Sequence, residues 1–196
     1  DCMLVKQLTG VNVGWRAYLA SDANYRLELN DSGAESNDDS AWNDTEPTST
    51  VFSVGTSTST NGSGQNYVAY LFTSIKGYSK FGKYVGNGNG NGAFVYTGFK
   101  PAFIIVKNIG GTGNWGMNDN KRDFNTQYGN DASVYANQSD AETTSSSLNA
   151  DFLSNGFKLR TTSNSYNQSG GTYGFMAFAS EPLVANVGQS IPATAT

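Results

Sequence analysis

Short apolar stretches recur along the whole chain and are separated by stretches rich in Gly, Asn, Ser and Thr. Residues 15–19 and 25–29 alternate between apolar and polar side chains, a pattern typical of half-buried β-strands. Residues 102–106 form a continuous apolar run of strand length. No segment combines helical periodicity with capping residues, so the pattern predicts an all-β protein.

The pattern occurs twice. A polar Asn/Ser/Gly turn followed by an aromatic-rich strand occupies residues 61–74 and again 167–180, which places Tyr67 and Tyr173 106 positions apart. Four further features recur in the same order. They are an apolar strand with a lysine (Lys6 and Lys107), a Trp strand (Trp15 and Trp115), an Asn…Ala-Glu loop (Asn30 and Asn137) and a Phe strand (Phe52 and Phe157). Five collinear matches indicate an internal duplication.

The duplication sets the expected domain boundaries. Residues 78–101 contain two more strand patterns around a Gly-Asn loop and have no counterpart in the first copy. We therefore expect a first repeat that lacks its opening strands (residues 1–77, copy one) and a complete second repeat (residues 78–183, copy two). Residues 184–196 are expected to be a linker or extended tail. Strands every 8–12 residues predict tandem β-sandwiches of the jelly-roll type, arranged in series with separate cores.

The composition suits an extracellular or virion protein. Charged residues make up only 14% of the chain and aromatic residues 13%, with a net charge of −4. The 12 basic residues are scattered, which argues against nucleic-acid binding. No apolar run approaches the ~20 residues of a membrane span, so no membrane insertion is expected. The single cysteine, Cys2, excludes an intrachain disulfide and is expected to be a buried thiol rather than an interchain partner.

The absence of histidine removes Ser-His-Asp and Cys-His catalysis and His-bearing zinc sites. Only carboxylate chemistry remains, chiefly glycoside hydrolysis, with the candidate acids Glu28, Glu35, Glu142, Asp119, Asp123 and Asp151. Because Glu35 and Glu142 occupy equivalent positions in different copies, we expect them to be loop residues that accept backbone hydrogen bonds rather than a catalytic pair. The sequence predicts no enzyme and no cofactor.

Two segments resemble ligand loops without meeting their requirements. The glycine-asparagine run 86–92 lacks the Gly-Lys-Ser/Thr ending of a phosphate loop, so it is expected to be a flexible hairpin loop, whose Asn89 could contact a ligand. The acidic stretches at 38–44 and 119–123 lack the spacing of a dedicated calcium loop. Surface salt bridges are favoured there, and no metal is predicted.

Aromatic residues provide the other candidate contacts. Trp15 and Trp115 fall on matching strands, which favours core packing over a sugar-stacking role. Trp42 lies in a polar stretch whose composition predicts a loop. It is the first candidate for a ligand contact, because an aromatic side chain in such a loop often marks an interface. Tyr128 and Tyr166, also in polar stretches, are the next candidates.

Copy two carries a long collinear pattern: Phe81-Gly-Lys-Tyr84-Val-Gly-Asn-Gly88, Gly98-Phe99-Lys-Pro101, Asp119-Asn-Lys-Arg122 and Tyr173-x-x-Met-Ala177-Phe178. This pattern resembles a domain of unknown function found, often repeated, in tail-fibre and other structural proteins of tailed bacteriophages, especially marine ones. Copy one matches from Met3 to Phe72 but lacks the opening segments and the Asp-x-x-Arg element. The resemblance implies a virion-surface protein, trimeric, that acts in host adsorption or fibre structure.

The leading hypothesis is a non-enzymatic tail-fibre segment that recognises a host surface glycan or protein, or presents the receptor-binding tip. Its expected partners are other virion tail proteins and copies of itself in a homotrimer. The alternative is a structural subunit of a virion or extracellular filament with no ligand of its own. A carboxylate-dependent polysaccharide depolymerase is the third possibility.

Overall fold

The computed structural model describes residues 1–10, 13–122, 132–142 and 148–180. The described chain is mostly β, as the sequence predicts, with three antiparallel sheets and three one-turn helices. The tail predicted for residues 184–196 and the candidate Tyr128 lie outside the described residues.

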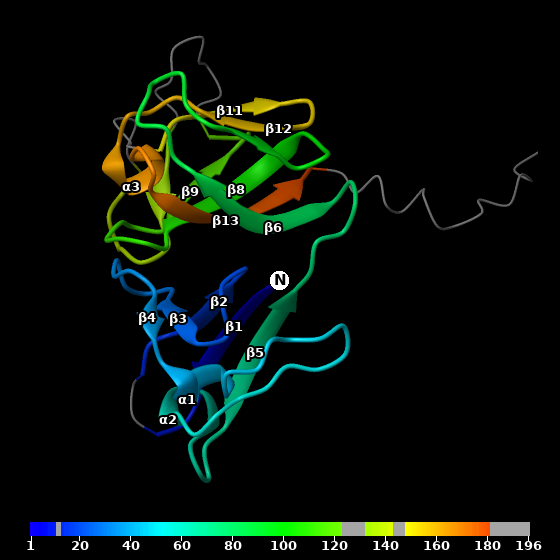
Figure 1. Ribbon diagram of the computed structural model, residues 1–196, viewed down its shortest axis with the longest axis vertical. Helices are drawn as coiled ribbons and strands as arrows, with labels where there is room; N and C mark the ends of the chain where they lie inside the picture. The colour runs from blue at the N-terminus through cyan, green and yellow to red at the C-terminus, as the bar shows by residue number, and fades with distance from the viewer. Residues whose placement is uncertain (11–12, 123–131, 143–147, 181–196) are drawn as a thin grey trace, which may run out of the picture.

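The first sheet is built from copy one and has the order β4-β3-β2-β1-β5 (Figure 1). Its strands are β1 (Cys2–Gln7), β2 (Arg16–Leu19), β3 (Tyr25–Glu28), β4 (Ser36–Asn37) and β5 (Tyr67–Phe72). The helices α1 (Asp39–Trp42) and α2 (Thr58–Asn61) follow β4 in the chain. Ala41 and Trp42 of α1 pack with Met3, Val5 and Tyr18 on one face of this sheet.

Copy two forms the other two sheets. The second sheet has the order β10-β9-β8-β13-β6 and the third β11-β12-β7. Their strands are β6 (Ser79–Val85), β7 (Phe94–Tyr96), β8 (Pro101–Asn108), β9 (Gly116–Asp119), β10 (Val134–Tyr135), β11 (Ala150–Leu153), β12 (Gly156–Leu159) and β13 (Thr172–Ala179), and the helix is α3 (Asn164–Asn167). Apolar side chains from the two sheets, Ile104 and Phe157 among them, form the core of a sandwich.

The first and second sheets have the same strand order and the same register. Strands β3-β2-β1-β5 correspond to β10-β9-β8-β13. Met3 lies opposite Leu71, and their counterparts Ile104 and Ala177 also lie opposite each other. The same agreement holds for Arg16 opposite Glu28 and for Gly116 opposite Tyr135. The sequence offsets therefore reappear as equivalent hydrogen-bonded pairs.

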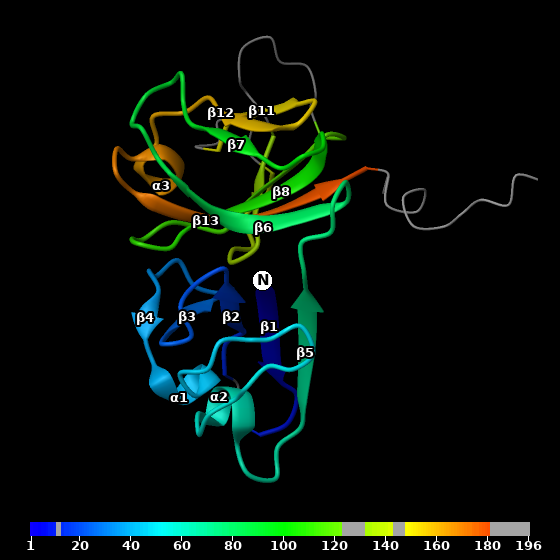
Figure 2. The same ribbon diagram turned by 45° about the vertical axis from the view of Figure 1, so that its right-hand side comes forward.

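Each copy has a buried cluster of its own, and the two copies also share a third. One buried cluster combines Cys2, Leu19 and Leu27 of copy one with Phe81, Trp115, Met176 and Ile109 of copy two. In Figure 2 the strands of the first sheet lie with one end near the second sheet and run across its strand direction. The second sheet thus takes part both in the sandwich core of copy two and in the cluster shared with copy one.

The Phe strand expected at residues 51–54 does not form. Its counterpart in copy two is β12, which is paired on both sides, by β11 and by β7. Copy one offers neither partner among the described residues, so Phe52 lies in an irregular segment and packs partly against the Trp42 cluster. A strand needs neighbours to satisfy its backbone groups, and here they are missing.

Candidate functional site

Trp42, the first candidate from the sequence, is not a loop residue. It ends α1, is 0% exposed, and packs edge-to-face against Tyr18 with ring centroids 6.4 Å apart. The polar stretch around it forms a helical turn whose apolar side faces the first sheet. Trp42 therefore presents no ring face to a ligand, and the loop assignment is corrected to a core position.

Tyr166, a later candidate, is likewise a core residue. It lies in α3 and is 1% exposed, and its hydroxyl donates to the carbonyl of Asn114 at 3.3 Å. Burial raises the pKa of Tyr166 above its ordinary range. The polar residues around it, predicted to be a loop, form a one-turn helix. Ser163 caps this helix, and its side chain accepts from the Ser165 N–H.

Asn89 lies at the surface, in the loop between β6 and β7. Its N–H donates to Asn87 Oδ1 at 3.0 Å, and its own Oδ1 accepts from the Asn91 N–H at 2.8 Å. Its carbonyl accepts from Asn167 Nδ2 at 2.8 Å. The loop expected to be flexible is thus built from successive Asx turns and tied to α3.

The two equivalent tryptophans differ in their surroundings. In both, the backbone N–H donates to an asparagine Oδ1: Trp15 donates to Asn30 at 2.6 Å and Trp115 to Asn137 at 2.9 Å. Trp115 is fully buried between the copies, and its Nε1 donates to the carbonyl of Glu28 at 2.9 Å. Trp15 is only partly buried and does not belong to that shared cluster. The expectation of core packing holds for Trp115 but not fully for Trp15.

Trp15 forms a solvent-facing aromatic surface with Tyr70. The two rings stack with centroids 6.0 Å apart and planes at 27°, and Tyr70 is 49% exposed. Beside Trp15 lies a depression of about 330 Å³ lined by Lys6, Val13, Gly14, Trp15 and Asn30. We call these residues together with Tyr70 the Trp15 site. It combines aromatic faces, an amide and an ammonium group in one concave place, as small-ligand sites do.

Close contacts of the Gly14 and Val13 backbone with neighbouring side chains shape this depression. A Cβ at Gly14 would lie 2.6 Å from Asn30 Oδ1 and 2.7 Å from Glu28 Oε2, so a larger residue there would have to displace these two side chains. Lys6 donates to the carbonyl of Val13 across the turn. These contacts fix the turn that carries Trp15 and hold the indole at the edge of the depression.

The chain as a whole was compared with known proteins. Residues 1–182 match the family model "Domain of unknown function (DUF7483)". The chain belongs to this family. The match spans both copies, so the DUF7483 region includes the first sheet and its interface with the second. No curated protein and no solved structure matches the chain. Among the described residues, no helix is long and apolar enough to cross a membrane.

The candidate acids of this DUF7483 chain have arginine or hydroxyl partners. Asp119 pairs with Arg122 at 2.9 Å and Asp151 with Arg160 at 2.6 Å. Glu35 accepts from Ser21 at 2.5 Å, whereas its counterpart Glu142 lies 3.7 Å from Arg122. Asp123 lies outside the described residues. Glu35 and Glu142 thus lie in loops of different copies, but their partners are a serine hydroxyl and an arginine rather than the backbone N–H groups expected.

A cluster of ion pairs joins β2, β3 and the residue that caps α1. Glu28 pairs with Arg16 and Arg26, each at 2.7 Å, and Arg26 also pairs with Asp38 at 2.5 Å. Burial favours a higher pKa for Asp38, but hydrogen bonds from Ser40 and Arg26 outweigh it and lower that pKa. In the part of the chain that the structure describes, no three His, Cys, Asp or Glu residues gather closely enough to hold a metal ion.

Proposed function

We propose that this DUF7483 chain is a non-enzymatic recognition segment of a phage tail fibre, located on the virion outside the cell, that binds a host surface saccharide at the Trp15 site. The single observation that supports this is the stack of the partly buried Trp15 on the exposed Tyr70 beside a depression, at a position whose counterpart, Trp115, is buried. An apolar C–H face of a sugar packs on aromatic rings, while its hydroxyls exchange hydrogen bonds with groups such as Asn30 and Lys6.

The finer architecture is part of the same proposal. Copy two is proposed to be a jelly-roll-like β-sandwich, and copy one a second such repeat without its opening strands. The proposed assembly is a homotrimer joined to other tail proteins, which raises a weak single-site affinity through several copies per virion.

The test is saccharide binding by the purified protein, screened on a panel of bacterial surface polysaccharides and measured by calorimetry. Trp15→Ala is expected to weaken binding roughly tenfold or more, equivalent to about 1.4 kcal/mol, because it removes the stacking platform. Tyr70→Ala is expected to weaken it less. Tyr96→Ala is the matched control, because Tyr96 is a 65% exposed aromatic on a strand of copy two.

Unchanged affinity in both Trp15→Ala and Tyr70→Ala would move the saccharide site elsewhere. No binding to any polysaccharide would favour the alternative, a structural subunit without a ligand. The observation that supports this alternative is the exposure of apolar side chains along and after β5, where Leu71 is 57% and Ile75 38% exposed. Such surfaces often mark contacts with other chains.

A further inference from the structure

The equivalent strands β5 and β13 differ at one edge. Strand β13 is paired on one side by β8 and on the other by β6, with Tyr173 opposite Tyr84 and Phe178 opposite Ser79. Strand β5 is paired by β1 alone among the described strands. We call its other side the open edge. Its exposed backbone groups can accept an added strand.

Tyr67 on β5 has the same setting as Tyr173 on β13. The Tyr67 hydroxyl donates to the carbonyl of Thr58 at 2.5 Å and accepts from the Gly62 N–H at 2.7 Å. Tyr173 makes the equivalent bonds at 2.6 and 2.7 Å. Tyr173, however, is also covered by the ring of Tyr84 on β6, with centroids 5.0 Å apart and planes at 16°. Within the described residues, Tyr67 has no such ring on it and stays partly exposed.

The asparagines that end α2 and α3 show the same difference. Asn167 is fully buried, and its Nδ2 donates to the carbonyl of Thr161 at 2.7 Å, as Asn61 Nδ2 does to the carbonyl of Gly55 at 2.8 Å. Asn167 also binds the Gly-Asn loop, through Asn87 and the carbonyl of Asn89. Asn61 makes the equivalent bond to the carbonyl of Gly55, and its side chain is exposed. At the equivalent position of copy two, the remaining hydrogen-bonding groups of Asn167 hold the Gly-Asn loop.

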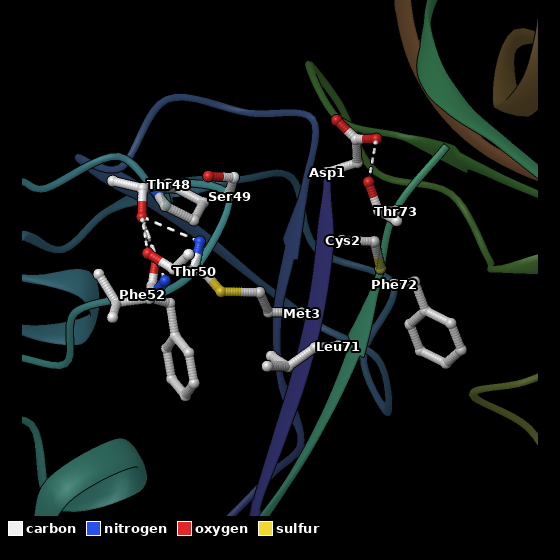
Figure 3. A pocket seen from close by; sticks show the side chains of 12 residues that line it. Asp1, Cys2, Met3, Thr48, Ser49, Thr50, Phe52, Leu71, Phe72 and Thr73 are labelled. Carbon is white, nitrogen blue, oxygen red and sulfur yellow. Dashed lines mark hydrogen bonds between the residues drawn. The ribbon is translucent and has the colours of Figure 1, made fainter. Parts of the chain in front are cut away.

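A cavity of about 550 Å³ lies next to the open edge, on the face of the first sheet that α1 covers. Figure 3 shows Met3 and Leu71 pointing into it toward Phe52, whereas Phe72 points to the other side of the sheet. In copy two, the counterparts Ile104, Ala177 and Phe157 are 0% exposed and belong to the same buried cluster as Val95 and Phe99. Residues from β7 and the turn after it thus provide the cover that the cavity lacks.

All three unfilled features correspond to one continuous piece of copy two, residues 79–99. β6 covers the edge and the tyrosine, the Gly-Asn loop binds the asparagine, and Val95 and Phe99 fill the apolar space. The net charges of the two parts are also complementary. Residues 1–77 contain nine acidic and four basic residues, whereas residues 79–99 contain two lysines and no acidic residue. Three features along one path, with complementary charge, point to a single occupant.

We propose that the open edge, Tyr67, Asn61 and the cavity beside Met3 together form a docking surface for one polypeptide segment that has the pattern of residues 79–99 and lies outside residues 1–196. The segment adds a strand antiparallel to β5, places a tyrosine on Tyr67 and a Gly-Asn loop on Asn61, and inserts apolar residues beside Met3, Phe52 and Leu71. It lies on the side of β5 away from Trp15, so it does not cover the depression of the Trp15 site.

The probe is a synthetic peptide with the sequence of residues 78–101, added to the full chain and followed by amide NMR and fluorescence anisotropy. We expect saturable binding with shifts confined to β5, α2 and the cavity. The control peptide carries Tyr84→Ala and Gly86→Val. In copy two a Cβ at Gly86 would lie 2.3 Å from the carbonyl oxygen of Gln168, so this peptide cannot approach the α2 turn in the same way. It is expected to bind at least tenfold more weakly.

Matched variants of the chain locate the surface. Leu71→Asp, at a residue 57% exposed, is expected to weaken peptide binding at least tenfold, because it places a charge against the apolar segment. Val85→Asp, at a strand residue 60% exposed on β6, is expected to leave binding unchanged. Equal binding of both peptides, or an unchanged affinity in Leu71→Asp, would overturn the proposal.

A free peptide must order a long loop on binding, which lowers its affinity. The same segment is therefore also fused before Asp1, where tethering raises its effective concentration. The fusion is expected to raise the melting temperature and to protect the amides of β5 from hydrogen exchange. Absence of both effects overturns the proposal, as does a dimer of the unfused chain that is lost in Leu71→Asp and is not displaced by the peptide.

Discussion

The most unusual single residue is Lys107, whose side chain is fully buried between the two copies. Its ammonium donates to the carbonyls of Ser32 in copy one, at 3.0 Å, and of Asn108 and Gly113, each at 2.9 Å. Loss of water lowers the pKa of Lys107 to about 8, although the nearby Asp31 carboxylate acts in the opposite direction. The amine therefore acts as a three-way link between the copies, held by neutral carbonyls rather than by a direct ion pair.

Replacing Lys107 tests this link. Because the pKa of Lys107 in the folded chain is lower than its ordinary value of 10.5, the unfolded chain binds more protons between pH 8 and 10.5. The contribution of Lys107 to stability therefore grows as pH rises through that window, by up to about 3 kcal/mol. Lys107→Met is expected to lower stability at pH 7 by about 1–3 kcal/mol, because buried carbonyls lose their donor.

The measurement is denaturant unfolding of the wild type and Lys107→Met at pH 7 to 10. The difference between them is used, because buried tyrosines affect both proteins alike. Lys6→Met is the matched control, since Lys6 occupies the same strand position but is only partly buried, and it is expected to cost less. Parallel pH profiles for wild type and Lys107→Met would show that the buried amine has no shifted pKa.

At the scale of elements, residue pattern identified the strands but not the one-turn helices. Alternation within residues 15–19 and 25–29 located β2 and β3, because side chains on a strand point to opposite faces. The helices α2 and α3 span four residues each, too short for periodicity, and their main signals are the N-caps Ser57 and Ser163. The strand expected at residues 51–54 did not form because its pairing partners are missing among the described residues. The local residue pattern contains no information about such partners.

Asn167 and Asn61 give an element-scale prediction. Asn167→Ala removes the bonds that tie α3 to the Gly-Asn loop and leaves its buried partners unpaired. We expect it to destabilise the chain by about 2–3 kcal/mol. Asn61→Ala, at the equivalent but exposed position, is expected to cost below about 1 kcal/mol. Thermal unfolding of both variants measures the difference, and similar losses at the two sites would contradict the role given to the loop.

At the scale of the whole molecule, the packing of the sheets decided which predicted site residues are exposed. Trp15 and Trp115 have nearly the same local sequence setting, and their backbone N–H groups bond equivalent asparagines. Only the placement of one sheet across the other buries Trp115 and leaves Trp15 beside a depression. The sequence therefore identified Trp15 and Trp115 as an equivalent pair but could not tell which of the two is buried. Tyr70, which stacks on Trp15 from β5, had no local sequence signal for this role.

The interface between the copies has the character of a core. Leu19, Phe81, Trp115 and Met176 are all buried in one cluster, and backbone bonds cross it, from the Glu35 N–H to the Ile109 carbonyl at 2.9 Å and from the Gly113 N–H to the Ser32 carbonyl at 2.9 Å. Separating the copies would expose these side chains and break these bonds. The described residues should therefore unfold as one unit.

Scanning calorimetry tests this unit with two variants far from the interface. Val5→Ala leaves a cavity in the cluster that belongs to copy one alone, and Phe157→Leu leaves one in the cluster that belongs to copy two alone. Each is expected to cost about 1–3 kcal/mol and to lower the midpoint of one shared transition by several degrees. If the copies were independent domains, the wild type would show two transitions and each variant would move only one of them, because neither copy would then depend on the core they share.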